Sequence, residues 1–156
     1  MTTAQQPDPR SRVFPPGIVV VAILLGVGLH YLLPFRLIAQ PAGRWIGGVL
    51  ILAWVGIAAM AVGAFRGAGT TLNPTAEVTA FVIGGPYRFS RNPMYLGLLL
   101  LQSGIAFVLG NGWVLLLTLA SFVVLDRIVI VGEEGHLAAK YGAAYDDYRR
   151  KVRRWL

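Results

Sequence analysis

The sequence predicts an all-α fold: a multi-pass transmembrane helical bundle of about four spans, followed by a C-terminal amphipathic helix at the membrane interface. The first observation is composition. Of the 156 residues, 56% are hydrophobic and only 13% are charged, which is more apolar surface than a soluble domain of this size can bury. The second is that the apolar residues fall into four runs, and the third is that most basic residues flank one end of those runs.

The four apolar runs define the predicted spans, which are residues 17–33, 45–65, 94–109 and 113–132. A bilayer core needs about 20 helical residues, so the second and fourth runs are long enough and the other two need flanking residues. Small residues in the second run suit close helix packing: Gly47, Gly56, Ala59 and Gly63. Residues 1–14 are predicted to be a disordered lead, and residues 15–156 a single membrane domain.

The basic residues favour an orientation with both termini in the cytoplasm. In that orientation eleven Lys and Arg residues lie on the inner side, and only Arg36 and Arg44 lie on the outer side. This is a positive-inside distribution. We therefore expect an integral protein of a bacterial inner membrane, whose net charge of +7 faces anionic lipid rather than nucleic acid.

The stretch GGPYRFSRNPMYLG, residues 84–97, gathers polar residues at the cytoplasmic start of the third span. Asn92 is a favoured helix N-cap and Pro93 suits the first helical position, so the helix should begin at Pro93. Its free amides and positive dipole end would attract an anion, and Arg88 and Arg91 would strengthen that site. The alternative is that these residues only seat the helix in the membrane interface.

Charged residues also mark the end of the fourth span, first Asp126 and Arg127 and then Glu133 and Glu134. Seven residues separate Asp126 from Glu133 and Arg127 from Glu134, so each pair is expected on one helix face. Arg127 lies inside the span, where an ionisable group is costly and usually functional; the alternative is a structural ion pair. The two glutamates are expected at the C-terminal end of the helix, where carboxylates oppose the dipole and need a cation. We expect them beside the polar start of the third span.

Residues 133–156 are predicted to form a cytoplasmic amphipathic tail helix. Its apolar residues recur at intervals of three and four, which defines one helix face: Leu137, Tyr141, Tyr145, Tyr148, Val152 and Trp155. The Arg-rich end suits a helix that lies on anionic lipid. The three tyrosines leave room for a second role, because aromatic faces attract cations.

Taken in order, these motifs resemble the isoprenylcysteine carboxyl methyltransferase family and the related small membrane phospholipid N-methyltransferases. The matching residues are Gly-Pro-Tyr-Arg, then Arg-Asn-Pro-Met-Tyr-Leu-Gly, then Glu-Glu with a downstream Leu, Tyr-Gly, Tyr, Tyr and Val-x-Arg, over about residues 68–154. One position departs from the carboxyl methyltransferases, which usually read Arg-His-Pro. This chain has Asn92 there, as in the phospholipid branch.

The resemblance implies an S-adenosylmethionine-dependent membrane methyltransferase with a lipophilic acceptor that enters from the bilayer. The expected acceptor is a carboxylate, and the alternative is N-methylation of a phospholipid or another amine. Arg127 would orient the acceptor, and Glu134 would be the base for an amine. The residues implied in cofactor binding are Tyr87, Arg88, Arg91, Asn92, Pro93, Tyr95, Leu96, Gly97, Glu133, Glu134, Tyr141 and Tyr145.

Other classes of membrane protein are less consistent with the sequence. A small transporter would carry an acidic residue deep in an early span, and the first two spans contain none. A haem protein would use His30 and His136 as axial ligands, but the predicted topology places them at opposite membrane faces. A structural or assembly protein is the other alternative. The chain has no cysteine, which excludes disulfides, thiolate metal sites and cysteine nucleophiles, and no metal site is predicted.

Overall fold

A computed structural model describes residues 14–36, 39–69 and 81–156, and every regular element in these ranges is a helix. The expected disordered lead therefore lies, except for Phe14, outside the described residues. The elements in chain order are α1 (Pro15–Leu32), α2 (Ala42–Gly67), the 3-10 helix η2 (Gly85–Arg88), α3 (Pro93–Leu109), α4 (Gly112–Val124), the π-helical segment η3 (Leu125–Ile130), α5 (Val131–Tyr141) and α6 (Ala143–Lys151).

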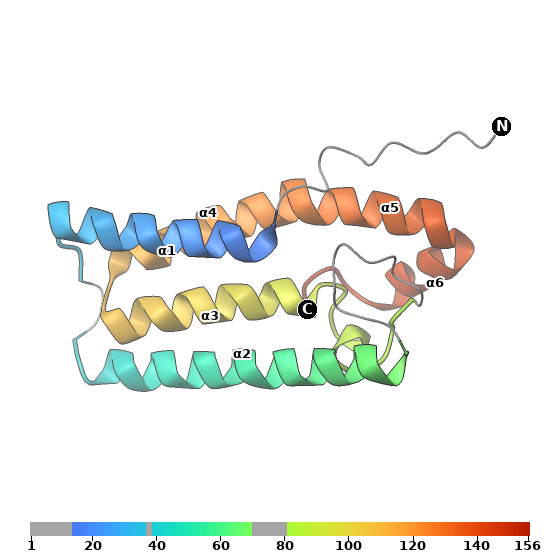
Figure 1. The fold of residues 1–156 in the computed structure, drawn as a ribbon, viewed down its shortest axis with the longest axis horizontal. Coiled ribbons are helices and arrows are strands. Elements are labelled where there is room, and N and C mark those ends of the chain that lie inside the picture. The colour runs from blue at the N-terminus through green and yellow to red at the C-terminus, as the bar shows by residue number, and fades with distance from the viewer. Residues whose placement is uncertain (1–13, 37–38, 70–80) are drawn as a thin grey trace.

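Helices α1 to α4 lie side by side and run alternately up and down (Figure 1). Helix α2 packs mainly on α3, α1 packs mainly on α4, and α3 joins the two pairs through α4. Three helices are long and apolar enough to cross a membrane, namely α1, α2 and the continuous helix Gly112–Tyr141, and α3 is a shorter apolar helix. The predicted helical membrane bundle is confirmed, and the protein is an integral membrane protein.

Glycines permit the closest approach between α2 and α3. A Cβ atom on Gly47 would lie 2.5 Å from the carbonyl oxygen of Gly104, and a Cβ on Gly104 would lie 2.7 Å from Ile51 Cγ1. Small residues let helix backbones approach in this way. The packing role expected of Gly47 is therefore confirmed. The same role expected of Gly56 and Gly63 is wrong, because a Cβ on either would meet no atom of the described residues within 4 Å.

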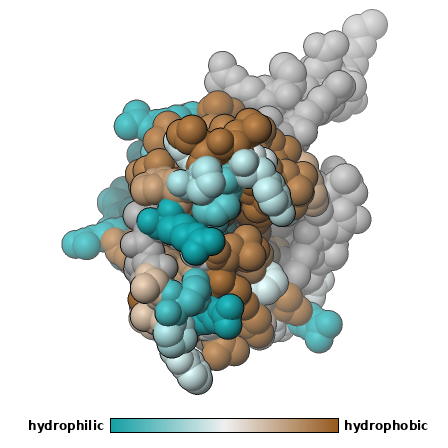
Figure 2. All heavy atoms as spheres, turned by 90° about the vertical axis from the view of Figure 1, so that its left-hand side faces the viewer, coloured by the Kyte–Doolittle hydropathy of each residue, from teal (hydrophilic) through white to brown (hydrophobic). Residues whose placement is uncertain are grey.

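The end of the bundle far from α5 and α6 is closed by a short turn between α3 and α4. Gly110 adopts a φ of +63°, which a glycine accepts without strain, and it ends α3. Asn111 then caps α4, because its Oδ1 accepts hydrogen bonds from the amides of Trp113 and Val114, while its Nδ2 donates to Gly26 O in α1 at 3.2 Å. Figure 2 looks onto this end, where hydrophobic atoms surround a band of polar residues.

The last part of the chain differs from the prediction in two ways. The helix that carries the fourth span continues past residue 132, since α4, η3 and α5 form one helix up to Tyr141. Residues 133–156 are not one helix. Gly142 takes a φ of +51° and separates α5 from α6, so the residues expected on one continuous face are divided between two helices and a final non-helical segment.

Candidate functional site

The polar stretch before α3 lies where the sequence places it, at the start of that helix. Helix α3 begins at Pro93, as predicted. Asn92 is the N-cap residue, as predicted, but its side chain does not accept from the helix amides; its Nδ2 instead donates to the carbonyl oxygen of Arg154 at 3.0 Å. Ser90 Oγ donates to the same carbonyl at 3.3 Å and accepts from the amide of Asn92 at 3.1 Å. The final segment of the chain therefore lies against this loop.

Arg91 connects the loop to α5 and α6. Its Nη1 lies 3.0 Å from Glu134 Oε1 and donates to the hydroxyl of Tyr145 at 3.3 Å, and its backbone amide donates to Arg153 O at 2.9 Å. Burial raises the pKa of Tyr145, so this phenol stays neutral. The Nε of Arg91 is buried and has no hydrogen-bond partner among the residues that the structure describes. A buried donor of this kind is unfavourable unless it finds an acceptor.

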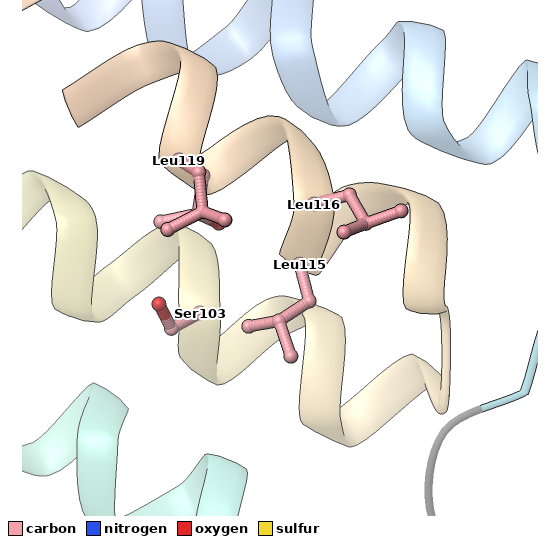
Figure 3. A pocket seen from close by; sticks show the side chains of 5 residues that line it. Ser103, Leu115, Leu116 and Leu119 are labelled. Atoms are coloured by element: carbon pink, nitrogen blue, oxygen red, sulfur yellow. The ribbon is translucent and has the colours of Figure 1, made fainter. Parts of the chain in front are cut away.

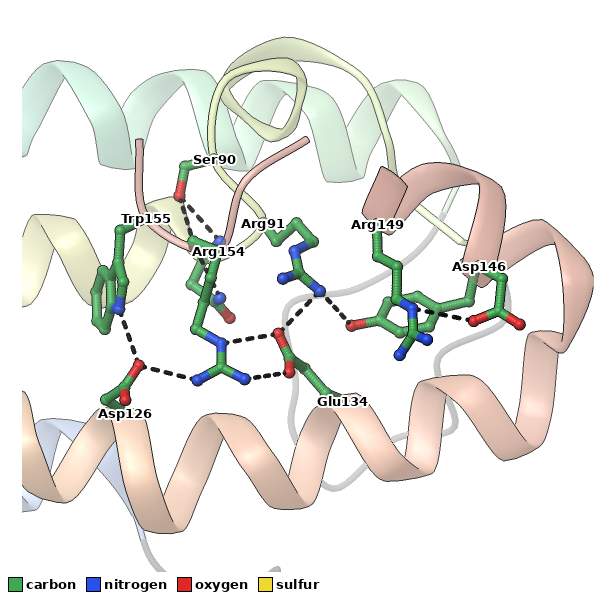
Figure 4. A network of polar contacts seen from close by, with 10 residues as sticks. Ser90, Arg91, Asp126, Glu134, Asp146, Arg149, Arg154 and Trp155 are labelled. Carbon is green, nitrogen blue, oxygen red and sulfur yellow. Dashed lines mark hydrogen bonds and ion pairs between the residues drawn. The ribbon is translucent and has the colours of Figure 1, made fainter. Parts of the chain in front are cut away.

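Arg154 sits between two carboxylates that project from one side of the long helix (Figure 4). Its Nε and Nη2 donate to the two oxygens of Glu134 at 3.2 and 2.7 Å, and its Nη1 donates to Asp126 Oδ1 at 3.1 Å. The contact with Glu134 raises the pKa of Arg154, so the guanidinium stays charged. Trp155 Nε1 donates to Asp126 Oδ1 at 2.9 Å. Two arginines and two acids form the centre of a compact, charge-balanced cluster.

The π-helical segment explains why Asp126 lies on the same helix face as Glu134 rather than Glu133. In a regular α-helix the residue seven positions on returns to the same face. A π turn holds one extra residue, and η3 includes Asp126 itself. The residue eight positions on therefore returns to that face, and Arg154 can bind both side chains. The prediction that residues seven positions apart, such as Asp126 and Glu133, share a helix face is wrong for this reason.

Glu133 binds a different residue. It accepts a hydrogen bond from the hydroxyl of Tyr95, which lies in the first turn of α3. The glutamates and the start of α3 are thus brought together as the sequence predicts, Glu134 through Arg91 and Glu133 through Tyr95. The expectation that the glutamates end their helix is wrong, since α5 continues to Tyr141.

Aromatic rings cover the side of the cluster formed by α5 and α6. Phe81 stacks on Tyr141 with ring centroids 5.0 Å apart, and it meets Tyr148 and Tyr145 edge to face at 5.3 and 6.0 Å. The Tyr148 hydroxyl donates to the carbonyl of Tyr87 at 2.6 Å, and burial raises the pKa of Tyr148 to about 12. The tail tyrosines therefore gather around a phenylalanine that the sequence patterns did not single out.

Several predicted site residues lie outside the hydrogen-bonded cluster. Arg88 is exposed. Gly97 faces α2, since a Cβ there would lie 3.1 Å from Trp54 Cδ1, and Leu96 is half-buried. Arg127 has a side chain that is 78% exposed, and its Nε pairs with Asp126 at 3.3 Å. Arg127 thus does not contact Glu134, and the ion pair considered as the alternative for it is present.

Sequence reasoning missed four residues of the cluster: Ser90, Asp126 as a ligand of Arg154, Arg154 and Trp155. Arg154 is the arginine of the Val-x-Arg motif, so a signal for it was present. The helix-face assignment placed it on the basic, lipid-facing side of a continuous tail helix instead. Its true position depends on the break at Gly142 and on the turn of the chain after α6.

The cavities found among the described residues are lined mainly by apolar side chains. One apolar pocket of about 310 Å³ lies between α3 and α4 and is lined by Ser103, Leu115, Leu116, Thr118 and Leu119 (Figure 3). Ser103 is ten residues beyond Pro93, or about 15 Å along α3. The pocket has no charged side chain in its lining, so the polar chemistry belongs to the cluster rather than to this pocket.

Comparison with known proteins identifies the family. A model of the phospholipid methyltransferase family matches residues 42–144, about two thirds of the chain. The chain belongs to this family. Membership of this family indicates a membrane methyltransferase. The matched residues include α2, α3, the long helix and both glutamates.

A relative in Haemophilus influenzae, described as an uncharacterized protein, is 40% identical over 63 residues. That match covers 40% of this chain and all of the relative. No solved structure matches the chain.

Proposed function

We propose that this phospholipid methyltransferase family member is an S-adenosylmethionine-dependent enzyme that methylates a lipophilic acceptor at one face of the membrane. The observation that carries the proposal is the cluster of Arg91, Glu134, Arg154 and Asp126 at the start of α3. Charged groups are expensive near the hydrocarbon core and are usually functional there. Family membership supports methyl transfer as that function.

The cluster fits the amino-acid end of the proposed cofactor, which carries one carboxylate and one ammonium group. Arg91 Nε is a buried donor without a described partner, and a carboxylate would satisfy it. Glu134 supplies anionic oxygens for the ammonium group. Tyr141 and Tyr145 would present their aromatic rings to the positive charge. When bound, S-adenosylmethionine supplies a methyl group that is activated by an adjacent positive sulfur.

The depth of the cluster supports an acceptor that stays in the bilayer. Counted from Gly112, Asp126 lies about 21 Å and Glu134 about 33 Å along the helix, whereas the hydrocarbon core is about 30 Å thick. Helix α3 has only 17 residues, about 25 Å, so its polar start lies near the same boundary. A lipid headgroup can reach this depth without leaving the membrane.

We propose an amine as the acceptor, since the family is that of phospholipid methyltransferases. An ammonium group must lose a proton before it can attack the methyl carbon, so a base is needed. Glu134 is less suited to that role than the sequence suggested, because two arginines already bind it. Glu133 accepts from the Tyr95 hydroxyl and is the better candidate.

A carboxylate acceptor is the second candidate, and Arg127 favours it. This guanidinium is largely exposed at a depth that a lipid headgroup reaches, and it could pair with an acceptor carboxylate. A carboxylate needs no base. Its methylation rate should stay nearly flat above about pH 5, whereas the rate for an amine should rise with pH until the amine or its base has titrated.

The test is transfer of a labelled methyl group from S-adenosylmethionine to a lipid extract by the purified protein, followed by identification of the labelled lipid. We expect a labelled lipid whose formation rises with pH, and a large loss of product with Glu133→Gln. A rate that does not change with pH, together with a methyl ester product, would show that the acceptor is a carboxylate and not an amine. No labelled lipid with any extract, together with no cofactor binding, would refute the proposed function.

A further inference from the structure

Asp126 holds two consecutive residues of the final segment of the chain, Val152–Leu156. Its Oδ1 accepts hydrogen bonds from Arg154 Nη1 at 3.1 Å and from Trp155 Nε1 at 2.9 Å, and its Oδ2 faces Arg127 Nε at 3.3 Å. The Asp126 side chain is 15% exposed. This acid is therefore committed to protein partners, and none of the roles given above to cofactor-binding residues requires it to touch a ligand.

The final segment is also bonded on its other side, to the loop before α3. The carbonyl of Arg153 accepts from the Arg91 amide, and the carbonyl of Arg154 accepts from Ser90 Oγ and Asn92 Nδ2. The ring of Trp155 lies 5.0 Å from that of Phe122 and packs on the buried cluster of Leu99, Leu125 and Val129. The segment thus joins two elements that contribute separate parts of the site.

Two anchors fix the guanidinium of Arg154. Glu134 holds the edge formed by Nε and Nη2, and Asp126 holds Nη1. A planar guanidinium bound on both sides by carboxylates has little freedom to turn. With Glu134 as its only anchor, the side chain of Arg154 could pivot, and only the bonds to its backbone would still hold the segment to the loop.

We propose that Asp126 is a positioning residue that latches the final segment over the loop before α3 and thereby sets Arg154 against Glu134. The latch itself follows from contacts within the chain. Its consequence for catalysis rests on the proposed function, in which Glu134 binds the cofactor. Asp126 acts on the cofactor only through Arg154 and Glu134.

A thiol probe at Ser90 tests the latch without any ligand. Ser90 is 2% exposed beneath the segment, and the chain has no cysteine, so Ser90→Cys introduces a single thiol. In that background Asp126→Asn should raise the rate of maleimide labelling about tenfold or more, because a charge-assisted hydrogen bond to the segment is lost. Asp147→Asn is the matched control. It removes an acid that pairs with Arg150 on the exposed side of α6, and labelling should not change.

A comparison of substitutions separates positioning from packing. Asp126→Asn keeps the shape of the side chain and loses its charge, whereas Asp126→Glu keeps the charge and changes the shape. If Asp126 positions Arg154 through its charge, Asp126→Glu should keep the slow labelling of the Ser90→Cys thiol and the tight binding of S-adenosylhomocysteine. Asp126→Asn should label faster and bind more weakly. Trp155→Phe retains the ring that packs on Phe122 but loses one bond to Asp126, and it should give a smaller increase in labelling.

The two measurements also separate this inference from the proposed function. If the wild-type protein fails to bind S-adenosylhomocysteine, the proposed function fails, and the labelling comparison still decides the latch. If Asp126→Asn labels as slowly as the wild type, the latch is refuted. If labelling rises but cofactor affinity is unchanged, the positioning of Arg154 on Glu134 is refuted. If Asp126→Asn keeps slow labelling and tight binding while Asp126→Glu loses both, Asp126 acts through its shape and is a packing residue.

Discussion

Arg154 organises the cluster at the level of single residues. Its guanidinium binds Glu134 and Asp126, and its carbonyl accepts from Ser90 and Asn92. In the sequence, Arg127 is easier to recognise as a candidate site residue, because it interrupts an apolar run. Its side chain is far more exposed than that of Arg154, 78% against 32%. Interactions of exposed ion pairs contribute little, so the two arginines should differ in function.

The first prediction compares these two arginines. Arg154→Met should weaken binding of S-adenosylhomocysteine about tenfold or more, because Glu134 loses its bidentate partner. Arg127→Met should change that affinity less than about threefold, because an exposed pair is lost. Titration calorimetry on the detergent-solubilised proteins measures both. Equal losses would place Arg127 in the cofactor site.

Gln102 is a second residue that the sequence did not single out. It lies in α3 and is fully buried, and neither of its amide atoms has a hydrogen-bond partner within the described part of the chain. An unsatisfied buried amide costs about 1–3 kcal/mol. Gln102→Met has a similar volume and no amide, so it should raise the thermal unfolding temperature. A fall in that temperature would mean that the amide has a partner inside the bundle, such as an ordered water.

At the scale of elements, the sequence predicted the helices better than their ends. Apolar runs located all four bundle helices, and Pro93 fixed the start of α3, because local composition and proline geometry determine both. The π turn at Leu125–Ile130 and the break at Gly142 were missed. A π turn has no simple pattern of apolar residues, and a glycine inside a periodic stretch is compatible with a helix. These two features decide which acid faces Arg154, so the site was predicted only in part.

Close packing of α2 on α3 gives a prediction at the same scale. A methyl group on Gly47 would meet Gly104 O at 2.5 Å and Val108 Cγ2 at 2.6 Å, whereas one on Gly48 would meet nothing within 4 Å in the described part of the chain. Gly47→Ala should therefore destabilise the protein by about 1–3 kcal/mol. Gly48→Ala should be neutral or slightly stabilising, because alanine favours the helix. Thermal unfolding followed by circular dichroism measures the difference, and equal effects would contradict the packing.

At the scale of the whole molecule, four alternating helices place the start of α1, the start of α3 and helices α5 and α6 at one end of the bundle (Figure 1). The cluster therefore lies on a single side of the membrane. The basic residues favour the cytoplasm for that side, and a cytoplasmic site has access to a soluble cofactor. The orientation remains a prediction from charge.

Reporter fusions test this orientation. A fusion after Leu156 should report the cytoplasm, and a reporter inserted at Gln40, in the connection between α1 and α2, should report the opposite side. The reverse pattern would place the cluster outside the cytoplasm and leave it without a supply of S-adenosylmethionine.

Titration calorimetry with S-adenosylhomocysteine is the most direct test of the central claim, that the cluster around Glu134 binds the methyl-donor cofactor. The wild-type protein should bind it, Glu134→Gln should bind at least about tenfold more weakly because an ionic contact is lost, and Asp147→Asn should bind like the wild type. Absence of binding by the folded wild-type protein, or equal affinity in Glu134→Gln, would contradict the claim.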